Sequence, residues 1–387
     1  MLRESWESSL EECEELLREL IRIDTCQPEG NEEKMADRLI DMLPGDVDHR
    51  KILHGNGRAS LIVKLEGASA TGGIAFIGHI DTVACGDENK WKYPPHGGAV
   101  ESGVMYGRGT SDMKGGVAAM LLALRSICKK KVKPVKPLYF CFTADEEKGG
   151  MGILDIAEKG LLETVEEVII CEPSDEQISI CEKGALWLSA RFEGRTSHAS
   201  RPDLGINAVE AACTFAEQMK LYLSEKPEHP LLGRATASVT KLEGGILTNM
   251  IPASSELEMD IRTVPGILHE ELREAVQGVV QKVKTMYKGV EIRVDVLNDR
   301  PAVGTEKTDP HVERILKLAG ELGICEIPRG THFYTDASQI IPILKAPFVI
   351  AGPGDDKLAH CIDEHVELRS VIRFAKFYES YVRCYYV

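Results

Sequence analysis

The chain has 387 residues, of which 43% are hydrophobic, and a formal net charge of −15. Its length and composition are typical of a globular protein with about two domains. The negative charge, with no Lys/Arg-rich stretch interleaved with aromatic residues, argues against nucleic acid as a partner. No apolar run approaches the roughly 20 residues that a membrane span requires, so we expect no membrane partner.

The cysteines also restrict the class of protein. There are 11 of them, with no C-x-x-C pair, and most lie in apolar segments such as LYFCF and VIICE. This usage is typical of small core residues in a reducing compartment and predicts a cytoplasmic location. The N-terminal segment MLRESWESSLEECEELLREL has helical apolar spacing with acidic residues, which is unlike a signal peptide.

The first part of the chain, up to about residue 181, alternates apolar strands with amphipathic helices. We expect strands near 59–65, 73–80, 137–143 and 167–171, and helices near 31–43 and 115–128. This alternation predicts an open α/β sheet with crossover connections.

After Gly184 the strands change character, because apolar residues now alternate with polar ones. The expected strands are LWLSARF, ATASVTKL, SELEMDIR and VEIRVDV, and the expected helices span about 206–223 and 269–287. Alternation predicts one buried and one wet face for each strand. The order β-α-β-β-α-β is the split, ferredoxin-like arrangement.

The first pattern returns after about residue 297. We expect a helix near 310–322, a strand at PFVIAG and a helix near 365–382. The sequence therefore predicts a discontinuous α/β domain of residues 1–181 and 297–387, interrupted by an inserted α+β domain of residues 182–296.

Polar residues that could carry chemistry collect at or near the ends of the expected α/β strands. In open α/β sheets, ligands bind at the carboxyl ends of the strands. The candidates are His79, Asp81, Asp112, Glu146, Glu147, Glu172 and His360. Each residue alone could be a surface polar group, and we expect the neighbouring Asp145 to be one.

These side chains suit a metal centre. Histidines and carboxylates without thiolates favour zinc, or cobalt or manganese, in a hydrolytic site. The charges of Asp112, Glu147 and Glu172, with one hydroxide, would balance a pair of divalent cations. Glu146 then remains to accept a proton from water, and Asp81 to orient His79 through its second ring nitrogen.

Five motifs, in order and over nearly the whole chain, resemble those of one family: GHIDTV, GRGTSDMKGG, ADEEKGG, CEPS and GPGDDKLAH. It is the family of di-zinc amidohydrolases that includes acetylornithine deacetylase, succinyl-diaminopimelate desuccinylase, aminoacylase and carboxypeptidase G. The resemblance implies a zinc-exopeptidase-like catalytic domain with a ferredoxin-like lid and dimerisation domain inserted, and hence a homodimer. One departure is Ala84, where the family usually has proline.

The resemblance also implies roles for single residues. His79 and Glu172 would bind one metal, Glu147 and His360 the other, and Asp112 would bridge both. Glu146 would be the general base.

The inserted domain carries further matches. GRTSHASRPDLGINA resembles the segment whose histidine, here His198, reaches a neighbouring subunit's active site and helps to stabilise the oxyanion. GGILTNMIP and DIRTVPG resemble segments that hold the substrate carboxylate, which implies Asn249 and Arg262. The planar fork of arginine suits that role, although Arg262 could instead pair with acids of its own strand. FYTDAS implies Thr335 as a pocket residue.

The expected function is hydrolysis of the amide bond of a small N-acyl amino acid by a metal-bridging hydroxide, with Glu146 as general base. A carboxypeptidase or dipeptidase acting on short peptides is an alternative with the same site. A non-catalytic carboxylate-binding protein is an alternative of another class, but it would not need Glu146. A nucleotide enzyme is disfavoured, because the first strands are not followed by G-x-G-x-x-G and G-x-x-x-x-G-K-[ST] does not occur.

Overall fold

The computed structural model describes residues 2–387, and the side chains of residues 10–387. The chain divides into two compact units. The first unit comprises the residues up to Ile180, Gly304–Arg329 and Thr335–Val387. The second unit comprises Cys181–Val303 and Gly330–Tyr334.

The largest sheet is mixed and has nine strands. Its main path runs in the order β1 (Asp48–Gly55), β2 (Arg58–Leu65), β6 (Leu138–Thr143), β3 (Gly73–His79), β7 (Val165–Ile170), β15 (Phe348–Ile350), β8 (Ser179–Glu182) and β13 (Val303–Gly304), and β14 (Arg329–Thr331) pairs with β8. Strand β3 runs parallel to both of its neighbours, β6 and β7. Every residue of β3 is buried, as its unbroken apolar sequence predicts.

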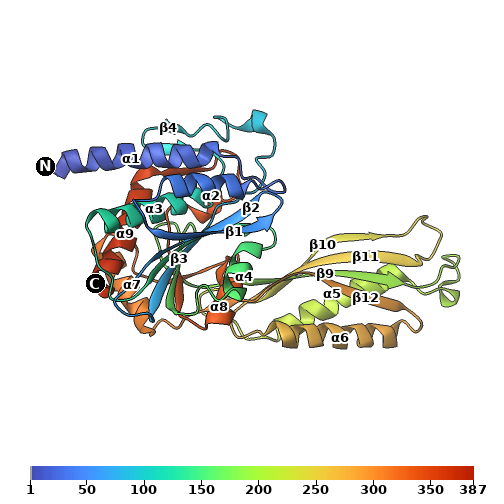
Figure 1. The fold of residues 1–387 in the computed structure, drawn as a ribbon. Helices are drawn as coiled ribbons and strands as arrows, with labels where there is room; N and C mark the ends of the chain where they lie inside the picture. Colours follow the sequence, from blue (N-terminus) through green and yellow to red (C-terminus); the bar gives the residue numbers. More distant parts are fainter. Residues whose placement is uncertain (1) are drawn as a thin grey trace. The chain divides into compact units, whose positions relative to one another are not determined.

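Helices cover this sheet. They are α1 (Leu2–Arg22), α2 (Glu32–Asp41), α3 (Lys114–Lys129), α4 (Met151–Glu158), α7 (Pro310–Glu321), α8 (Ala337–Leu344) and α9 (Leu368–Tyr385). Helices α1, α3 and α9 pack against one another (Figure 1). A small sheet of β16 (His365–Glu367), β5 (Val104–Tyr106) and β4 (Ala99–Glu101) and the short helices η1 (Glu88–Lys90) and η3 (Asp356–Leu358) complete the unit.

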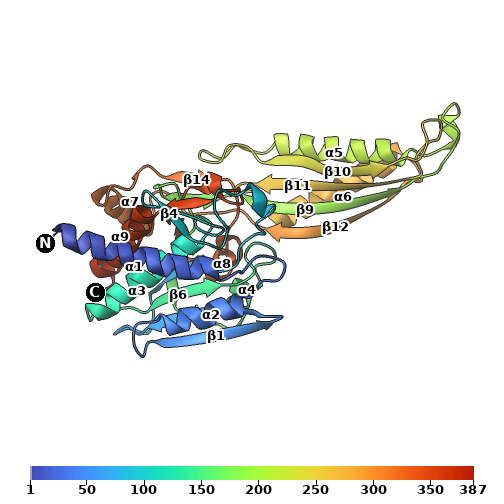
Figure 2. The same cartoon turned by 90° about the horizontal axis from the view of Figure 1, so that it is seen from above.

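The second unit is an antiparallel sheet with two helices on one face (Figure 2). The strand order is β10 (Thr236–Gly244), β11 (Ser254–Thr263), β9 (Gly184–Glu193), β12 (Glu291–Arg300), and the helices are α5 (Ala208–Ser224) and α6 (His269–Met286), with η2 (Pro202–Leu204) before them. Leu257, Met259 and Ile261 of β11 are buried against the helices, as their alternation predicts. Val296 is 46% exposed instead, because β12 is an edge strand.

The structure therefore has the predicted α/β class. Among the helices of residues 2–387, none combines the length and apolar character needed to cross a membrane.

Candidate metal centre

The candidate ligands of the first unit converge because their strands are parallel. His79 ends β3, Glu147 follows β6, and Glu172 follows β7. The register places His79 beside Thr143, at the carboxyl end of β6. Asp112 precedes α3, and His360 lies in the loop after η3. Residues up to 281 positions apart thus meet at one sheet edge.

The two carboxylate oxygens of Asp112 face different histidines. Its Oδ1 lies 3.0 Å from His79 Nε2, and its Oδ2 lies 3.4 Å from His360 Nε2. His79 Nε2 is also 3.5 Å from Glu172 Oε1, and His360 Nε2 is 2.9 Å from Glu147 Oε2. This grouping is the one that a bridging Asp112 requires, with one histidine and one glutamate on each side.

Asp81 contacts the second ring nitrogen of His79 through its backbone as well as through its side chain. His79 Nδ1 lies 2.9 Å from the Asp81 backbone carbonyl but 3.5 Å from its carboxylate. Because a carbonyl only accepts, Nδ1 carries a proton, and Nε2 is left as the atom that can bind a metal. The carboxylate also accepts hydrogen bonds from the backbone N–H groups of Glu146 and Glu147 and from Gln27 Nε2. Asp81 therefore fixes the turn that carries Glu146.

The local electrostatics fit divalent cations. Oε1 of Glu146 and Oε1 of Glu147 are buried and have no hydrogen-bond partner among the described residues. Burial raises the pKa of Glu146 and of Glu172 well above the usual range, and burial with the charge of Asp112 raises the pKa of Glu147 to about 7. A buried acidic cluster with two histidines lacks positive charge, which bound cations would supply.

Two acids that the sequence analysis left out support this cluster. Glu364 is buried, and its carboxylate accepts hydrogen bonds from the backbone N–H groups of Gly109, Ser111 and Asp112 and from Arg108. It thus positions Asp112. Asp336 accepts a hydrogen bond of 2.6 Å from Thr143, and its charge contributes to the raised pKa of Glu146. Asp336 lies inside the FYTDAS segment and Glu364 lies beyond the GPGDDKLAH motif, and neither has a further local signal.

The expectation for Asp145 is wrong. Its side chain is 7% exposed and forms an ion pair of 3.0 Å with Arg58, which also pairs with Glu32. Asp145 therefore anchors the turn before Glu146 instead of facing solvent.

In the second unit, His198 and Asn249 lie on paired loops. His198 and Met250 form an isolated antiparallel bridge, and the Ala199 N–H donates to the Asn249 carbonyl. The Ser200 N–H donates to His198 Nδ1 at 3.2 Å, so the ring proton lies on Nε2. His198 is exposed and can donate that hydrogen bond.

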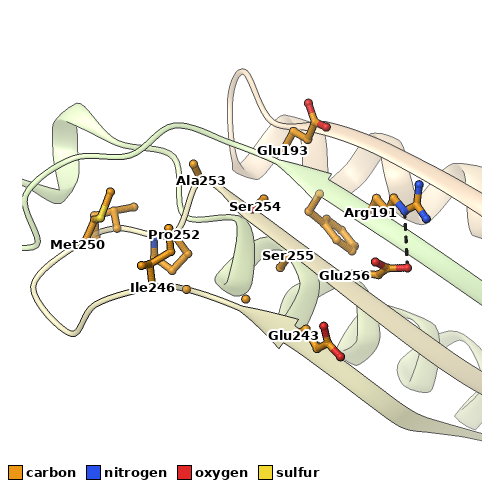
Figure 3. A pocket seen from close by; sticks show the side chains of 14 residues that line it. Arg191, Glu193, Glu243, Ile246, Met250, Pro252, Ala253, Ser254, Ser255 and Glu256 are labelled. Carbon is orange, nitrogen blue, oxygen red and sulfur yellow. Dashed lines mark ion pairs between the residues drawn. The ribbon is translucent and has the colours of Figure 1, made fainter.

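The loop that carries Asn249 borders a pocket of about 340 Å³ in the same unit (Figure 3). Ile246, Met250 and Pro252 of this loop line one end, and an ion pair between Arg191 and Glu256 lies in its wall. The pocket therefore contains no candidate metal ligand.

Arg262 pairs with an acid of its own strand. Its Nε and Nη2 donate to the Asp260 carboxylate, at 2.9 Å and 3.0 Å. A second arginine was missed by the sequence analysis: Arg300 is 1% exposed, and neither of its terminal nitrogens has a hydrogen-bond partner among the described residues. Both arginines pair in register with Ala185, from opposite sides, and both guanidinium groups lie over the Tyr334 ring.

Thr335 is buried at the start of α8. Its hydroxyl accepts a hydrogen bond from the Ala337 N–H at 3.1 Å, which is a helix-capping contact. Its proposed pocket role stays a prediction.

The acidic cluster leads to a prediction for the metal-free protein: its thermal stability should fall as pH rises from about 5.5 to about 8.5. Glu147, whose pKa is raised to about 7, becomes charged in this window at a cost to the fold. Contacts with Asp112 and Glu147 raise the pKa of His360 to about 11, so the stability gained from its protonated form declines as pH rises above the ordinary histidine pKa of 6.5. The pKa of Asp112 is lowered, so its contribution is lost only at acid pH.

Melting temperatures of chelated and zinc-refilled protein across this window would test the prediction. Refilling should raise the melting temperature most at the alkaline end, where the metal has fewer protons to displace from its ligands. A chelated protein of constant stability across the window would contradict it.

The chain is similar to known proteins over most of its length. The chain matches the model of Peptidase family M20/M25/M40 over residues 75–383. It is 25% identical over 402 residues to a Staphylococcus epidermidis protein named probable succinyl-diaminopimelate desuccinylase, covering 96% of each chain. It is 30% identical over 338 residues to acetylornithine deacetylase of Proteus mirabilis, covering 85% of this chain and 83% of that protein.

Among solved structures, the fold is similar to a dinuclear metal-binding peptidase of the M20 family from Bacillus subtilis. The TM-score is 0.73 and the sequence identity is 15%, and the match covers 98% of this chain and 99% of the other. At this identity the likeness concerns the fold.

Proposed function

Because the chain belongs to peptidase family M20/M25/M40, and is therefore a metal-dependent hydrolase of amide or peptide bonds, we propose that it removes the acyl group from small N-acyl amino acids. The observation that carries the proposal is the arrangement of Asp112 between two histidine–glutamate pairs, with Glu146 beside it. The acetylornithine deacetylase and desuccinylase names of the relatives support this substrate class.

In the proposed site, His79, Glu172, Glu147, His360 and the shared ligand Asp112 would hold two divalent ions, which we propose to be zinc in the cell. When bound, they would acidify water and polarise the substrate carbonyl. Glu146 accepts the proton of the attacking water and returns it to the departing amine nitrogen. Burial holds the pKa of Glu146 high, which suits a group that must carry this proton between steps. The Asp81 carboxylate keeps Glu146 in place by accepting a hydrogen bond from the Glu146 backbone N–H.

We propose that the inserted domain, residues 182–296, acts as lid and dimerisation domain. It would contribute Asn249, which would help to hold the substrate carboxylate, and His198. The Nε2–H of His198 would donate to the oxygen of the tetrahedral intermediate. Such a homodimer could pair through the edge strand β10, where Val239 and Leu242 are exposed. The proposal includes a cytoplasmic location, with which the eleven cysteines, all free in the structure, are compatible.

The substrate carboxylate would bind between Arg262 and Arg300. Ala185, between them on β9, has a small side chain. Arg262 shares its charge with Asp260, whereas the Nη atoms of Arg300 are unpaired and buried. A carboxylate would form a bidentate hydrogen-bonded pair with Arg300, so Arg300 contributes the greater part of the binding free energy of the substrate carboxylate.

The Arg300→Gln substitution should therefore raise KM for a carboxylate substrate by about 10- to 100-fold, the usual worth of a charged hydrogen-bonded pair. The corresponding substrate with a neutral amide in place of its carboxylate should show little change. The melting temperature should not fall, because the substitution removes an unpaired buried charge. Arg293→Gln, an exposed arginine of the same strand, is the control. Equal losses on both substrates would reject the role of Arg300.

The function is tested with a panel of N-acetylornithine, N-succinyl-diaminopimelate, N-acetylmethionine and dipeptides. Protein stripped with a chelator and refilled with zinc or cobalt should hydrolyse the N-acyl amino acids best, in a metal-dependent manner. Preference for dipeptides would favour the peptidase alternative. Binding of metals and carboxylates with no turnover of any member would favour the binding protein.

A further inference from the structure

A second cluster of metal-binding side chains lies outside the carboxylate centre. Cys26, Cys85 and His96 offer ligand atoms that all lie within 4.8 Å of one another. The Sγ atoms of the two cysteines are 3.6 Å apart. His96 Nε2 lies 3.4 Å from Cys85 Sγ and 3.9 Å from Cys26 Sγ. All three residues belong to the first unit.

These spacings are those of a tetrahedral thiolate and imidazole site. With Zn–S bonds of about 2.3 Å and Zn–N bonds of about 2.0 Å, tetrahedral angles place two sulfur ligands about 3.8 Å apart and sulfur and nitrogen about 3.5 Å apart. The three measured edges lie close to these values without rearrangement.

The imidazole has the orientation that a ligand needs. His96 Nδ1 lies 3.3 Å from the Ile21 backbone carbonyl, which only accepts. The ring proton therefore lies on Nδ1, and the lone pair of Nε2 faces the two thiols. A metal-binding histidine usually donates its other N–H to a carbonyl in this way.

A fourth ligand is within reach. Asp24 Oδ1 lies 3.7 Å from His96 Nε2 and accepts the Cys26 N–H at 2.9 Å. The site is partly open to solvent, since Cys26 and His96 are half-buried. The hydrogen bond between the two thiols lowers the pKa of Cys85 and raises that of Cys26, so Cys85 is the thiol favoured as a thiolate before a metal binds.

We propose that Cys26, Cys85 and His96 bind a third metal ion of the thiolate-preferring class, Zn²⁺ in the cell, with Asp24 or water as the fourth ligand. Binding releases one proton from each thiol and forms two metal–sulfur bonds. With Asp24 as the fourth ligand the tetrahedron is closed, which is the arrangement of a structural ion.

The site would stabilise the support of the carboxylate centre. Cys26 forms an isolated parallel β-bridge with Thr82. The next residue, Gln27, donates a hydrogen bond of 2.9 Å to the Asp81 carboxylate. The Trp91 indole N–H donates to the Cys85 carbonyl and holds the loop from the other side. A metal here would fasten the segment that positions Asp81 to the loop that follows β3.

A disulfide between Cys26 and Cys85 is the competing chemistry. It would require the sulfur atoms to approach from 3.6 Å to about 2.05 Å. It would also leave the Nε2 lone pair of His96, which is directed at both sulfur atoms, without a bonding partner. Metal binding uses all three groups, so the observations favour it.

Cobalt substitution of the full-length protein separates this site from the carboxylate centre. Thiolate ligands give Co²⁺ a near-ultraviolet charge-transfer band, and the carboxylate centre contains no thiolate. Protein stripped under reducing conditions should take up about three Co²⁺ per chain and show the band. The variants Cys26→Ser, Cys85→Ser and His96→Gln should take up about two, and both serine variants should lose or weaken the band. Cys213→Ser, at an exposed cysteine of the second unit, should match the parent.

The parent spectrum tests the proposal even if a variant folds poorly. Uptake of only two ions by fully reduced parent protein, with no charge-transfer band, would overturn it. A Cys26–Cys85 disulfide found by non-reducing mass spectrometry, with no band after its reduction, would overturn it in favour of a redox pair.

Discussion

Glu146→Gln should lower kcat by about 10³-fold or more while the protein keeps its metal content, because a positioned general base contributes about 10²- to 10⁴-fold. The substitution keeps the size of the side chain and removes its ability to accept a proton. It also keeps the backbone N–H that donates to Asp81, so the turn should be preserved. KM should change little, because the lost interaction acts in the transition state.

The metal content is the decisive part of this measurement. An oxygen of Glu146 lies within 4.8 Å of the ligand atoms of His79 and Glu172, which leaves a direct ligand role geometrically possible. Inactive protein with unchanged metal content would assign Glu146 to proton transfer. Loss of one metal together with activity would make it a ligand instead. Glu158→Gln, at an exposed residue of α4, should behave as the parent.

The parts of the fold that local sequence determines were predictable. Strand β3 was expected at 73–80 and spans Gly73–His79, because an apolar run of that kind fits a strand buried on both faces. The sequence analysis did not predict helix α8 or strand β1, for two different reasons. Helix α8 contains Pro342, which argues against a helix, and β1 is an edge strand in which only Ile52 is buried.

Most candidate ligands could be selected from the sequence because they follow a strand or precede a helix at one sheet edge, whereas His360 was selected through the GPGDDKLAH motif. Their supporting contacts could not be predicted, because they depend on residues far apart in the chain. Gln27 reaches Asp81, and Glu364 reaches the backbone before α3, more than 250 residues away. Cys26 and Cys85 were interpreted as ordinary buried thiols, since no local spacing places His96 beside them.

Asp112→Asn should reduce the affinity of both metals of the carboxylate centre, and activity should fall to the limit of detection. The amide keeps the shape of the side chain but lacks the charge that both histidine–glutamate pairs share. Changes to groups one step removed from a metal typically lower affinity by about 10- to 100-fold, so loss of a shared ligand charge should exceed that for each ion. His79→Ala and His360→Ala should each weaken chiefly one ion. Asp46→Asn, at an exposed aspartate, is the matched control.

The metal-free form of Asp112→Asn separates loss of a ligand from loss of structure. When the Asp112 charge is removed, His79 and His360 lose an ion-pair partner, which lowers the stability of the fold. The same change removes a repulsion that raises the pKa of Glu147 and of Glu172, which favours the fold at neutral pH. Because these effects oppose each other, the melting temperature of the chelated variant should stay close to that of the chelated parent, while zinc should stabilise only the parent strongly. A chelated variant that is already unfolded would show that Asp112 holds the loop before α3 and would contradict its assignment as primarily a shared ligand.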